Sequence, residues 1–284
     1  MLALIGGGRV SSYIGREACL KGIYFKCYSS RNNNKYDNIN YSSIIQVPSI
    51  VLKSSITNCL INWSHTYPRN IKDLKRSIIG FQSIAKMIDK HPKVKFTFVS
   101  STSAERELLD KSIYGSSKRL GETILLESNL TRSQEFKVRI VRPGLIYGLE
   151  SCPIHQIIKL YKKRIKLNLG REDANFAVTS INDFTEFALN SNSEFWNSNK
   201  DVFGFYEKEP YSLNDIHNSS SSYAKTNKLN ITLTNRSILY KIMELLGISI
   251  DLSLASIDRF PSTDSIVYNY SIGFDKYIKN LCIE

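Results

Sequence analysis

The sequence has few residues that could form a metal site or a disulfide framework. Its five cysteines and four histidines are scattered along 284 residues, without C-x-x-C spacing or a histidine cluster. Structural zinc sites need closely grouped ligands, and disulfide scaffolds need paired cysteines. We therefore expect no metal, and we interpret the cysteines as reduced thiols in the core.

Long apolar runs are also missing. The N-terminal run Met1–Ile5 ends at a glycine triplet, so it is too short for the apolar core of a signal peptide. No other run approaches the ~20 apolar residues of a membrane-spanning helix. These absences predict a soluble, cytoplasmic protein that has no membrane partner.

Acidic residues are outnumbered by basic ones. The chain has 38 Lys and Arg against 26 Asp and Glu, which is a formal charge of +12. Such a charge can attract phosphorylated ligands or nucleic acid. The basic residues are spread along the whole chain, however, and the densest cluster, Lys159–Lys166, could either line an anionic pocket or form a solvated helix face. We expect no nucleic-acid partner.

The remaining composition is typical of a globular protein, with 42% hydrophobic and 23% charged residues. A chain of this length can form one large α/β unit, or a major domain with a smaller lobe. Across residues 1–148, strand-like apolar runs alternate with helix-like segments. This alternation predicts βαβ units in a parallel sheet, and therefore an α/β fold.

A glycine-rich turn lies between the first predicted strand, Met1–Ile5, and a predicted helix over residues 11–21. Strand, glycine turn and helix form the context of a dinucleotide-binding fingerprint. Glycines let the backbone approach a pyrophosphate, whose charge then meets the helix N-terminus. The third fingerprint position is a serine, so the match is incomplete. The predicted cofactor-binding residues are Gly6, Gly8, Arg9, Ser11 and Gly15.

The end of the second predicted strand, Ile23–Tyr28, bears on the choice of cofactor. NAD-binding proteins place an acidic residue there for the ribose 2′-hydroxyl, whereas an arginine accommodates the 2′-phosphate of NADP. Here Ser29, Ser30 and Arg31 follow the strand, and no acidic residue occurs from Gly22 to Tyr36. A guanidinium matches a phosphate in bidentate fashion. We predict NADP, with NAD as the alternative.

Tyr114 is the only one of 16 tyrosines that has a lysine four residues later. If residues 114–127 form a helix, the phenol of Tyr114 and the ammonium of Lys118 share one face. A free phenol has a pKa near ~10, and a neighbouring positive charge stabilises its anion. Upstream, an apolar run ends in the hydroxyls Ser100, Ser101 and Thr102. The combination is typical of the acid–base pair of a carbonyl-reducing site.

The order of these motifs carries more information than any one of them. The glycine turn, the hydroxyl-terminated strand, the Tyr114/Lys118 helix and the strand end Arg142-Pro143-Gly144 together resemble the extended short-chain dehydrogenase/reductase family. That family includes nucleotide-sugar epimerases, dehydratases and reductases. The resemblance covers most of the chain and is strong over residues 94–148.

The resemblance implies a Rossmann-type doubly wound parallel sheet with a smaller C-terminal substrate-binding lobe. The NAD(P)-binding domain is expected over residues 1–150 and the lobe over residues 151–284, with a segment near 172–190 that returns to the main sheet. A nucleotide-sugar is the expected substrate. A homodimer is expected because relatives commonly pair through the helix that bears the tyrosine and lysine.

The resemblance also implies roles for single residues. Tyr114 transfers a proton to or from the substrate oxygen, while Lys118 lowers the pKa of that phenol and binds the nicotinamide ribose. A strand-end hydroxyl positions the carbonyl. It is Ser101 or, in an alternative register, Thr102, since the Val-Tyr-Gly usual after the hydroxyls is missing. Further residues are expected beside the cofactor (Ser64, Pro143 and Gly144) or at the substrate diphosphate (Arg171, Arg236 and Arg259).

Several reactions are known on this framework. Dehydratases of the family have an Asp-Glu pair directly after the strand-end hydroxyl, where this chain has Thr102-Ser103-Ala104. Epimerases usually retain NAD and have an acid at the second strand end, where this chain has Ser-Ser-Arg. Reduction of a keto-sugar nucleotide therefore fits best. A 4-epimerase with bound NAD is the first alternative, and a non-catalytic NAD(P)-binding sensor or scaffold is the second.

Other segments give plainer structural expectations. Apolar patterning predicts a strand over residues 56–64 and a helix over residues 70–90. In the run 176–184, Asp183 is expected to cap the helix that follows. The serine run Ser219–Ser222 predicts a mobile surface loop.

Overall fold

In the computed structural model, the described residues are 2–28, 55–62, 71–105, 113–130, 138–150, 152–162, 165–167, 174–190, 193–223, 231–233 and 273–283. The chain forms two compact units. The first combines residues 1–142 with 185–204, and the second combines residues 143–184 with 205–284.

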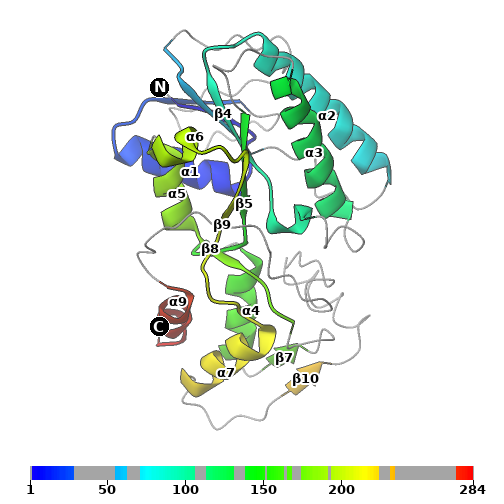
Figure 1. The fold of residues 1–284 in the computed structure, drawn as a ribbon. Helices are drawn as coiled ribbons and strands as arrows, with labels where there is room; N and C mark the ends of the chain where they lie inside the picture. Colours follow the sequence, from blue (N-terminus) through cyan, green and yellow to red (C-terminus); the bar gives the residue numbers. More distant parts are fainter. Residues whose placement is uncertain are drawn as a thin grey trace. The chain divides into compact units, whose positions relative to one another are not determined.

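The first unit is built on a six-stranded sheet with the order β2-β1-β3-β4-β5-β9. Neighbouring strands from β2 to β5 pair in parallel. Parallel pairing requires crossover connections, and three helices supply them, α1, α2 and α3 (Figure 1). The predicted Rossmann-type α/β sheet is therefore confirmed. The strands are β1 (Leu2–Ile5), β2 (Phe25–Tyr28), β3 (Asn58–Ile61), β4 (Lys95–Val99), β5 (Val138–Pro143) and β9 (Val202–Phe205).

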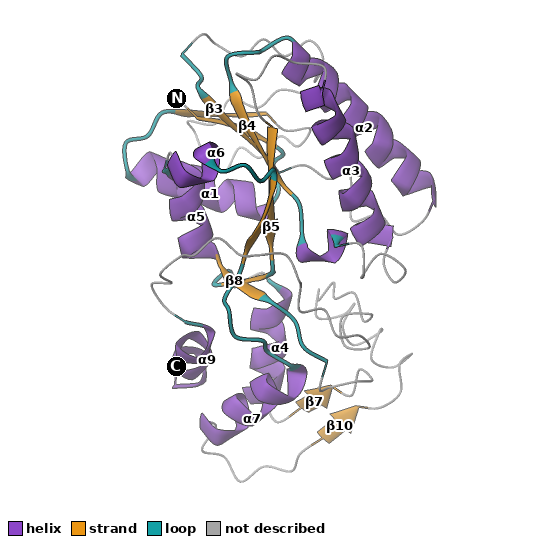
Figure 2. Ribbon diagram, viewed as in Figure 1, coloured by secondary structure: helices purple, strands orange, loops and turns teal. Residues whose placement is uncertain are grey.

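The crossover helices are α1 (Arg9–Leu20), α2 (Ile71–Asp89) and α3 (Ile113–Leu130). Figure 2 shows α2 and α3 side by side, next to the strands β3 to β5. The predicted helices over residues 70–90 and 114–127 correspond to α2 and α3, and the predicted strand over residues 56–64 is the shorter β3. Two short helices, α5 (Ile181–Leu189) and α6 (Ser193–Asn197), precede β9.

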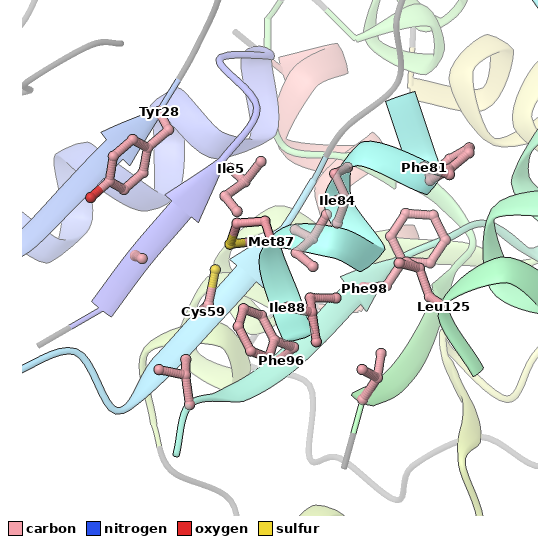
Figure 3. Close-up of a cluster of buried hydrophobic side chains, with 14 of the residues drawn as sticks. Ile5, Tyr28, Cys59, Phe81, Ile84, Met87, Ile88, Phe96, Phe98 and Leu125 are labelled. Carbon is pink, nitrogen blue, oxygen red and sulfur yellow. The ribbon is translucent and has the colours of Figure 1, made fainter. Parts of the chain in front are cut away.

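A buried apolar cluster joins the sheet to α2 and α3 (Figure 3). On α2, Phe81, Ile84 and Ile88 recur at helical spacing and are at most 1% exposed. The ring of Phe81 meets Phe98 of β4 edge to face, with centroids 5.3 Å apart. Gly121 of α3 packs so closely on the Phe81 ring that a Cβ there would lie 2.5 Å from it. A small residue at this position therefore sets the spacing between the two helices.

The register of the strands brings their carboxyl ends to one edge of the sheet. Ile5 pairs with Ile61, and Val99 pairs with Val141. In a doubly wound sheet, ligands bind outside the carboxyl ends of the strands, where the strand order reverses. Here the chain moves from β1 outward to β2, and then returns to β3 on the other side of β1. This reversal places the predicted ligand edge next to the glycine turn.

The second unit contains two short parallel strand pairs, β6 with β8 and β7 with β10. Its core is formed mainly by apolar side chains from three helices, among them Ile158, Ile216 and Phe274. The strands are β6 (Leu145–Tyr147), β7 (Ile165–Leu167), β8 (Val178–Ser180) and β10 (Ile231–Leu233), and the helices are α4 (Pro153–Lys162), α7 (Leu213–Tyr223) and α9 (Phe274–Ile283).

Two local predictions for this unit are wrong. The serine run Ser219–Ser222 is not a loop but part of α7, and Ser220 is fully buried. The helix begins with a capping box, in which Ser212 and Asp215 exchange hydrogen bonds between side chain and backbone. Packing of its first turns in the core then outweighs the modest helix propensity of serine.

Asp183 does not cap α5. It lies within the first turn of the helix, and its backbone N–H donates to the side-chain oxygen of Ser180 at 3.4 Å. Ser180 directly precedes the helix and therefore occupies the capping position. Both residue types are common caps, so the sequence did not distinguish between them.

Candidate active site

Tyr114 and Lys118 lie in the first two turns of α3, on one face as their spacing predicts. The Lys118 ammonium is 5.9 Å from the centre of the Tyr114 ring. It is only 4% exposed, and it donates to the carbonyl oxygen of Val99, the last residue of β4, at 3.0 Å. This bond ties the start of α3 to the carboxyl edge of the sheet.

Ser101 follows β4 and begins a short 3-10 helix, η2 (Thr102–Ala104). Its hydroxyl accepts a hydrogen bond from the backbone N–H of Ser103 at 3.2 Å, and it is also hydrogen-bonded to the side chain of Tyr114. Thr102 is buried within η2. Of the two predicted hydroxyls, Ser101 is thus the one that the structure brings to the phenol of Tyr114.

The electrostatic environment perturbs both members of the pair. Burial raises the pKa of Tyr114 to about 12, and the hydrogen bond with Ser101 acts in the opposite direction. Burial lowers the pKa of Lys118 to about 8, while the charge of Glu122 raises it. The phenol is therefore protonated at neutral pH, and it can donate a proton to an oxygen placed against Tyr114 and Ser101. Perturbed groups of this kind are concentrated at functional sites.

Glu122 and Arg142 form a buried ion pair beside Lys118 that sequence reasoning missed. The guanidinium of Arg142 donates from Nε to Oε1 at 2.9 Å and from Nη2 to Oε2 at 2.8 Å. Arg119 adds a third bond, to Oε2, at 3.2 Å. The signal was the glutamate four residues after Lys118, on the same helix face.

The glycine turn connects β1 to α1. Gly6 has φ +107°, a conformation that favours glycine. Gly8 caps α1 through its backbone only, and a Cβ there would meet no atom within 4 Å. The first turn of α1 contains no acidic residue. A helix N-terminus without a side-chain cap or an acidic first turn, and with open space beside Gly8, suits a phosphate.

Arg9 and Ser11 differ in how they are placed in α1. Arg9 is its first residue and is exposed, where a cation is unfavourable for the helix dipole unless an anion is bound nearby. Ser11 is buried, and its hydroxyl accepts a hydrogen bond from Nδ2 of Asn62 at 3.0 Å. Asn62 follows β3, so the bond ties the glycine turn to the neighbouring strand end. Sequence reasoning missed Asn62.

The remaining predicted site residues fall into three groups. Gly15 is buried within α1. Pro143 ends β5, and Gly144 belongs to the second unit, where its N–H donates to the hydroxyl of Thr179 at 2.8 Å. Ser29, Ser30, Arg31, Ser64, Arg171, Arg236 and Arg259 lie outside the described residues.

The second unit contains a buried polar cluster centred on Glu207, which the sequence did not indicate. Its carboxylate accepts hydrogen bonds from the hydroxyl of Tyr147 at 2.5 Å, the hydroxyl of Tyr211 at 3.4 Å and the N–H of Phe274 at 3.2 Å. Burial raises the pKa of Glu207. These bonds join β6, the segment before α7 and the start of α9, so we interpret the cluster as structural.

Within the described part of the chain, no group of three or more His, Cys, Asp or Glu is placed to hold a metal ion. The described helices include none with the length and apolar character needed to cross a membrane.

The chain is similar in structure to several solved enzymes. A UDP-glucose 4-epimerase from Thermotoga maritima, solved with UDP-glucose, has a TM-score of 0.74 at 13% identity, covering 99% of this chain and 97% of the epimerase. A dTDP-glucose 4,6-dehydratase from Bacillus anthracis, in complex with NAD, has a TM-score of 0.72 at 12% identity, covering 99% and 95%. A UDP-glucose 4-epimerase from Thermus thermophilus, also with NAD, has a TM-score of 0.62 at 14% identity, covering 99% and 98%.

In sequence, no protein-family model and no curated protein matches the chain. At these low identities, the structural likeness establishes the fold alone. The chain has the fold of the nucleotide-sugar epimerases and dehydratases, which confirms the resemblance drawn from the sequence at the level of the fold.

Proposed function

We propose that this protein is an NAD(P)-dependent oxidoreductase that acts on a nucleotide-sugar, and that its reaction is the reduction of a keto group on the sugar. The observation that carries the proposal is the convergence of Tyr114, Lys118 and Ser101 at the carboxyl end of β4. The three side chains come from two separate segments, and the glycine turn of β1 lies at the same edge of the sheet.

Each residue of this group has a role that its surroundings support. Ser101 positions the substrate oxygen, and Tyr114, protonated at neutral pH, donates a proton to it. Lys118 stabilises the phenolate that remains after the transfer. The bond from Lys118 to Val99 is the contact that a ribose hydroxyl of a cofactor can replace.

The residues around the glycine turn fit a dinucleotide. Open space beside Gly8, an exposed Arg9 and an α1 N-terminus without an acidic first turn would hold the pyrophosphate. When bound, a reduced nicotinamide supplies the hydride. The solved neighbours from Bacillus anthracis and Thermus thermophilus were determined with NAD. For this chain NADP is the finer proposal, because Ser29, Ser30 and Arg31 follow β2 where NAD-binding proteins have an acid.

A 4-epimerase that retains NAD is the second candidate. Two of the similar structures described above are UDP-glucose 4-epimerases, one of them solved with UDP-glucose. Epimerisation needs the same acid–base group, first to remove and then to return a proton. A dehydratase is less well supported, because Thr102-Ser103-Ala104 follows Ser101 where the acidic pair would be.

We also propose a homodimer through α2 and α3. On these helices, Ile71 and Ile79 are 68% and 62% exposed, and Leu120 is 37% exposed. A second copy that covered these side chains would remove apolar surface from water, which is favourable. Light scattering should give the mass of a dimer for the wild type and of a monomer for Ile79→Glu. A monomeric wild type would exclude the dimer.

One assay separates the candidate functions. Purified protein is mixed with NADPH or NADH and a panel of 4-keto sugar nucleotides, and in a parallel reaction with UDP-glucose and NAD, while the redox state of the cofactor is followed by absorbance. A reductase oxidises cofactor in proportion to product. An epimerase instead converts UDP-glucose to UDP-galactose without net oxidation, and a sensor or scaffold binds cofactor but turns over neither substrate.

A further inference from the structure

Glu122 is fully buried, and it lies four residues after Lys118 on α3. Both of its carboxylate oxygens accept hydrogen bonds from the Arg142 guanidinium. Arg142 is itself only 5% exposed. Bidentate, charge-assisted pairs are strong and geometrically specific, so the position of Glu122 relative to β5 is well defined.

Lys118 and the pair of Glu122 with Arg142 anchor the same face of α3. Lys118 and Glu122 are i and i+4 on α3. Lys118 is bonded to Val99 at the end of β4, and Glu122 is bonded to Arg142 near the end of β5. The strands β4 and β5 are paired directly, with Val99 opposite Val141. The face of α3 that carries the lysine is thus attached to two adjacent strand ends.

The charged groups near Lys118 have different effects on its pKa. Arg119 on α3 and Arg142 on β5 are cations, and Tyr114 is neutral at neutral pH. At the two ends of η2 are Ser101, which is hydrogen-bonded to Tyr114, and the buried Glu105. Burial lowers the pKa of Lys118, and the charge of Glu122 raises it.

We propose that Glu122, held in place by Arg142, is a positioning residue that keeps Lys118 as an ammonium beside Tyr114. The inference rests on the proposed function, because an ammonium at this place serves the proton transfer by Tyr114. Without the carboxylate, burial and two guanidinium groups would all disfavour the charged form of Lys118. A large part of Lys118 would then be neutral at neutral pH, since its pKa is already lowered to about 8, and in that fraction the phenolate would lose its stabilising charge.

The test is a direct titration of Lys118. The protein is labelled with [ε-13C]lysine, and the Lys118 signal is assigned by its loss in Lys118→Arg. In Glu122→Gln the titration midpoint should fall by about 1 pH unit or more. The high-pH limb of the pH profile of kcat for keto-sugar reduction should move to lower pH in the same variant. Glu127→Gln changes an exposed residue of the same helix, and it should leave both measurements unchanged.

A second variant covers the case in which Glu122→Gln does not fold, because it leaves a buried guanidinium without its acidic partner. The double variant Glu122→Gln/Arg142→Met removes both charges, a replacement that proteins commonly tolerate. Burial of Lys118 remains and the charge that raises its pKa is gone, so the midpoint should again fall, but by less than in Glu122→Gln because the Arg142 cation is removed as well. An unchanged midpoint in either folded variant overturns the inference. The titration needs no turnover, so inactivity of the wild type on every substrate would count against the proposed function alone.

Discussion

Gly115 in the first turn of α3 approaches Ser103 of η2 so closely that a Cβ at position 115 would lie 2.1 Å from the Ser103 carbonyl oxygen. No side chain fits at that distance without a movement of the backbone. The residues on either side of this contact are those of the proposed chemistry. Tyr114 precedes Gly115, and Ser101 caps η2, whose first turn includes Ser103. The close approach therefore sets the distance between the phenol and the hydroxyl.

Gly115→Ala should separate α3 from η2 and break the hydrogen bond between Tyr114 and Ser101. We expect turnover to fall by about 10²-fold, since a misplacement of about 1 Å can have that effect. Steady-state kinetics with the reduced cofactor and the best keto-sugar substrate measure it. Ser116→Ala changes the neighbouring position without adding bulk, and it is the control. Full activity in Gly115→Ala would show that the contact does not position the site.

Tyr114→Phe keeps the packing of the ring but removes the proton that is transferred. Turnover should fall by roughly 10²–10⁴-fold, while the dissociation constant of the cofactor changes little. Stopped-flow cofactor oxidation measures the first quantity, and fluorescence titration measures the second. Near wild-type turnover would rule out Tyr114 as the proton donor.

Ser101→Ala and Thr102→Val compare the two hydroxyls. Ser101 is bonded to Tyr114, so Ser101→Ala should lower kcat strongly, whereas Thr102→Val should have a small effect. The measurement is kcat and KM for both variants on one substrate. The opposite order would indicate that Thr102 positions the substrate oxygen.

Arg31→Ala tests the choice of cofactor. If Arg31 binds the 2′-phosphate, its loss removes a charge-assisted contact worth roughly 1.5–3 kcal/mol, so NADPH should bind about tenfold or more weakly. NADH has no 2′-phosphate, and its affinity should hardly change. Isothermal titration calorimetry with both cofactors gives the comparison. Equal losses for the two cofactors would mean that Arg31 does not recognise the phosphate.

The raised pKa of Glu207 predicts a pH dependence of stability. Between its ordinary pKa of 4.5 and the higher value in the folded protein, the folded state binds more protons than the unfolded state. The contribution of Glu207 is therefore fully present below about pH 4.5, and it is lost as the pH rises through the folded value. In urea unfolding, the free energy of the wild type should decrease over this range relative to Glu207→Gln. The exposed Glu209 provides the control Glu209→Gln, which should follow the wild type.

Much of the fold could be predicted from local patterns. The alternation of apolar runs and helical segments placed β1, β3, α2 and α3 close to their observed bounds. Glycine at positions 6 and 8 predicted a turn that the backbone of the structure contains. The prediction of a loop at the serine run in α7 was wrong because serine has only a weak local preference for loops. A capping box and packing in the core outweigh that preference.

Most of the contacts that position the candidate site were not predictable in this way. The i to i+4 spacing of Tyr114 and Lys118 is a property of one helix, so their shared face could be predicted from local spacing. The bond between Ser101 and Tyr114, the approach of Gly115 to Ser103 and the pair of Glu122 with Arg142 each join segments that are separate in the chain. Distances between such segments depend on the packing of whole helices and strands. They also depend on strand register, because a shift of one residue along the strand would put the next hydroxyl-bearing residue in the place of the first. These distances therefore become known only when the helices and strands are packed together.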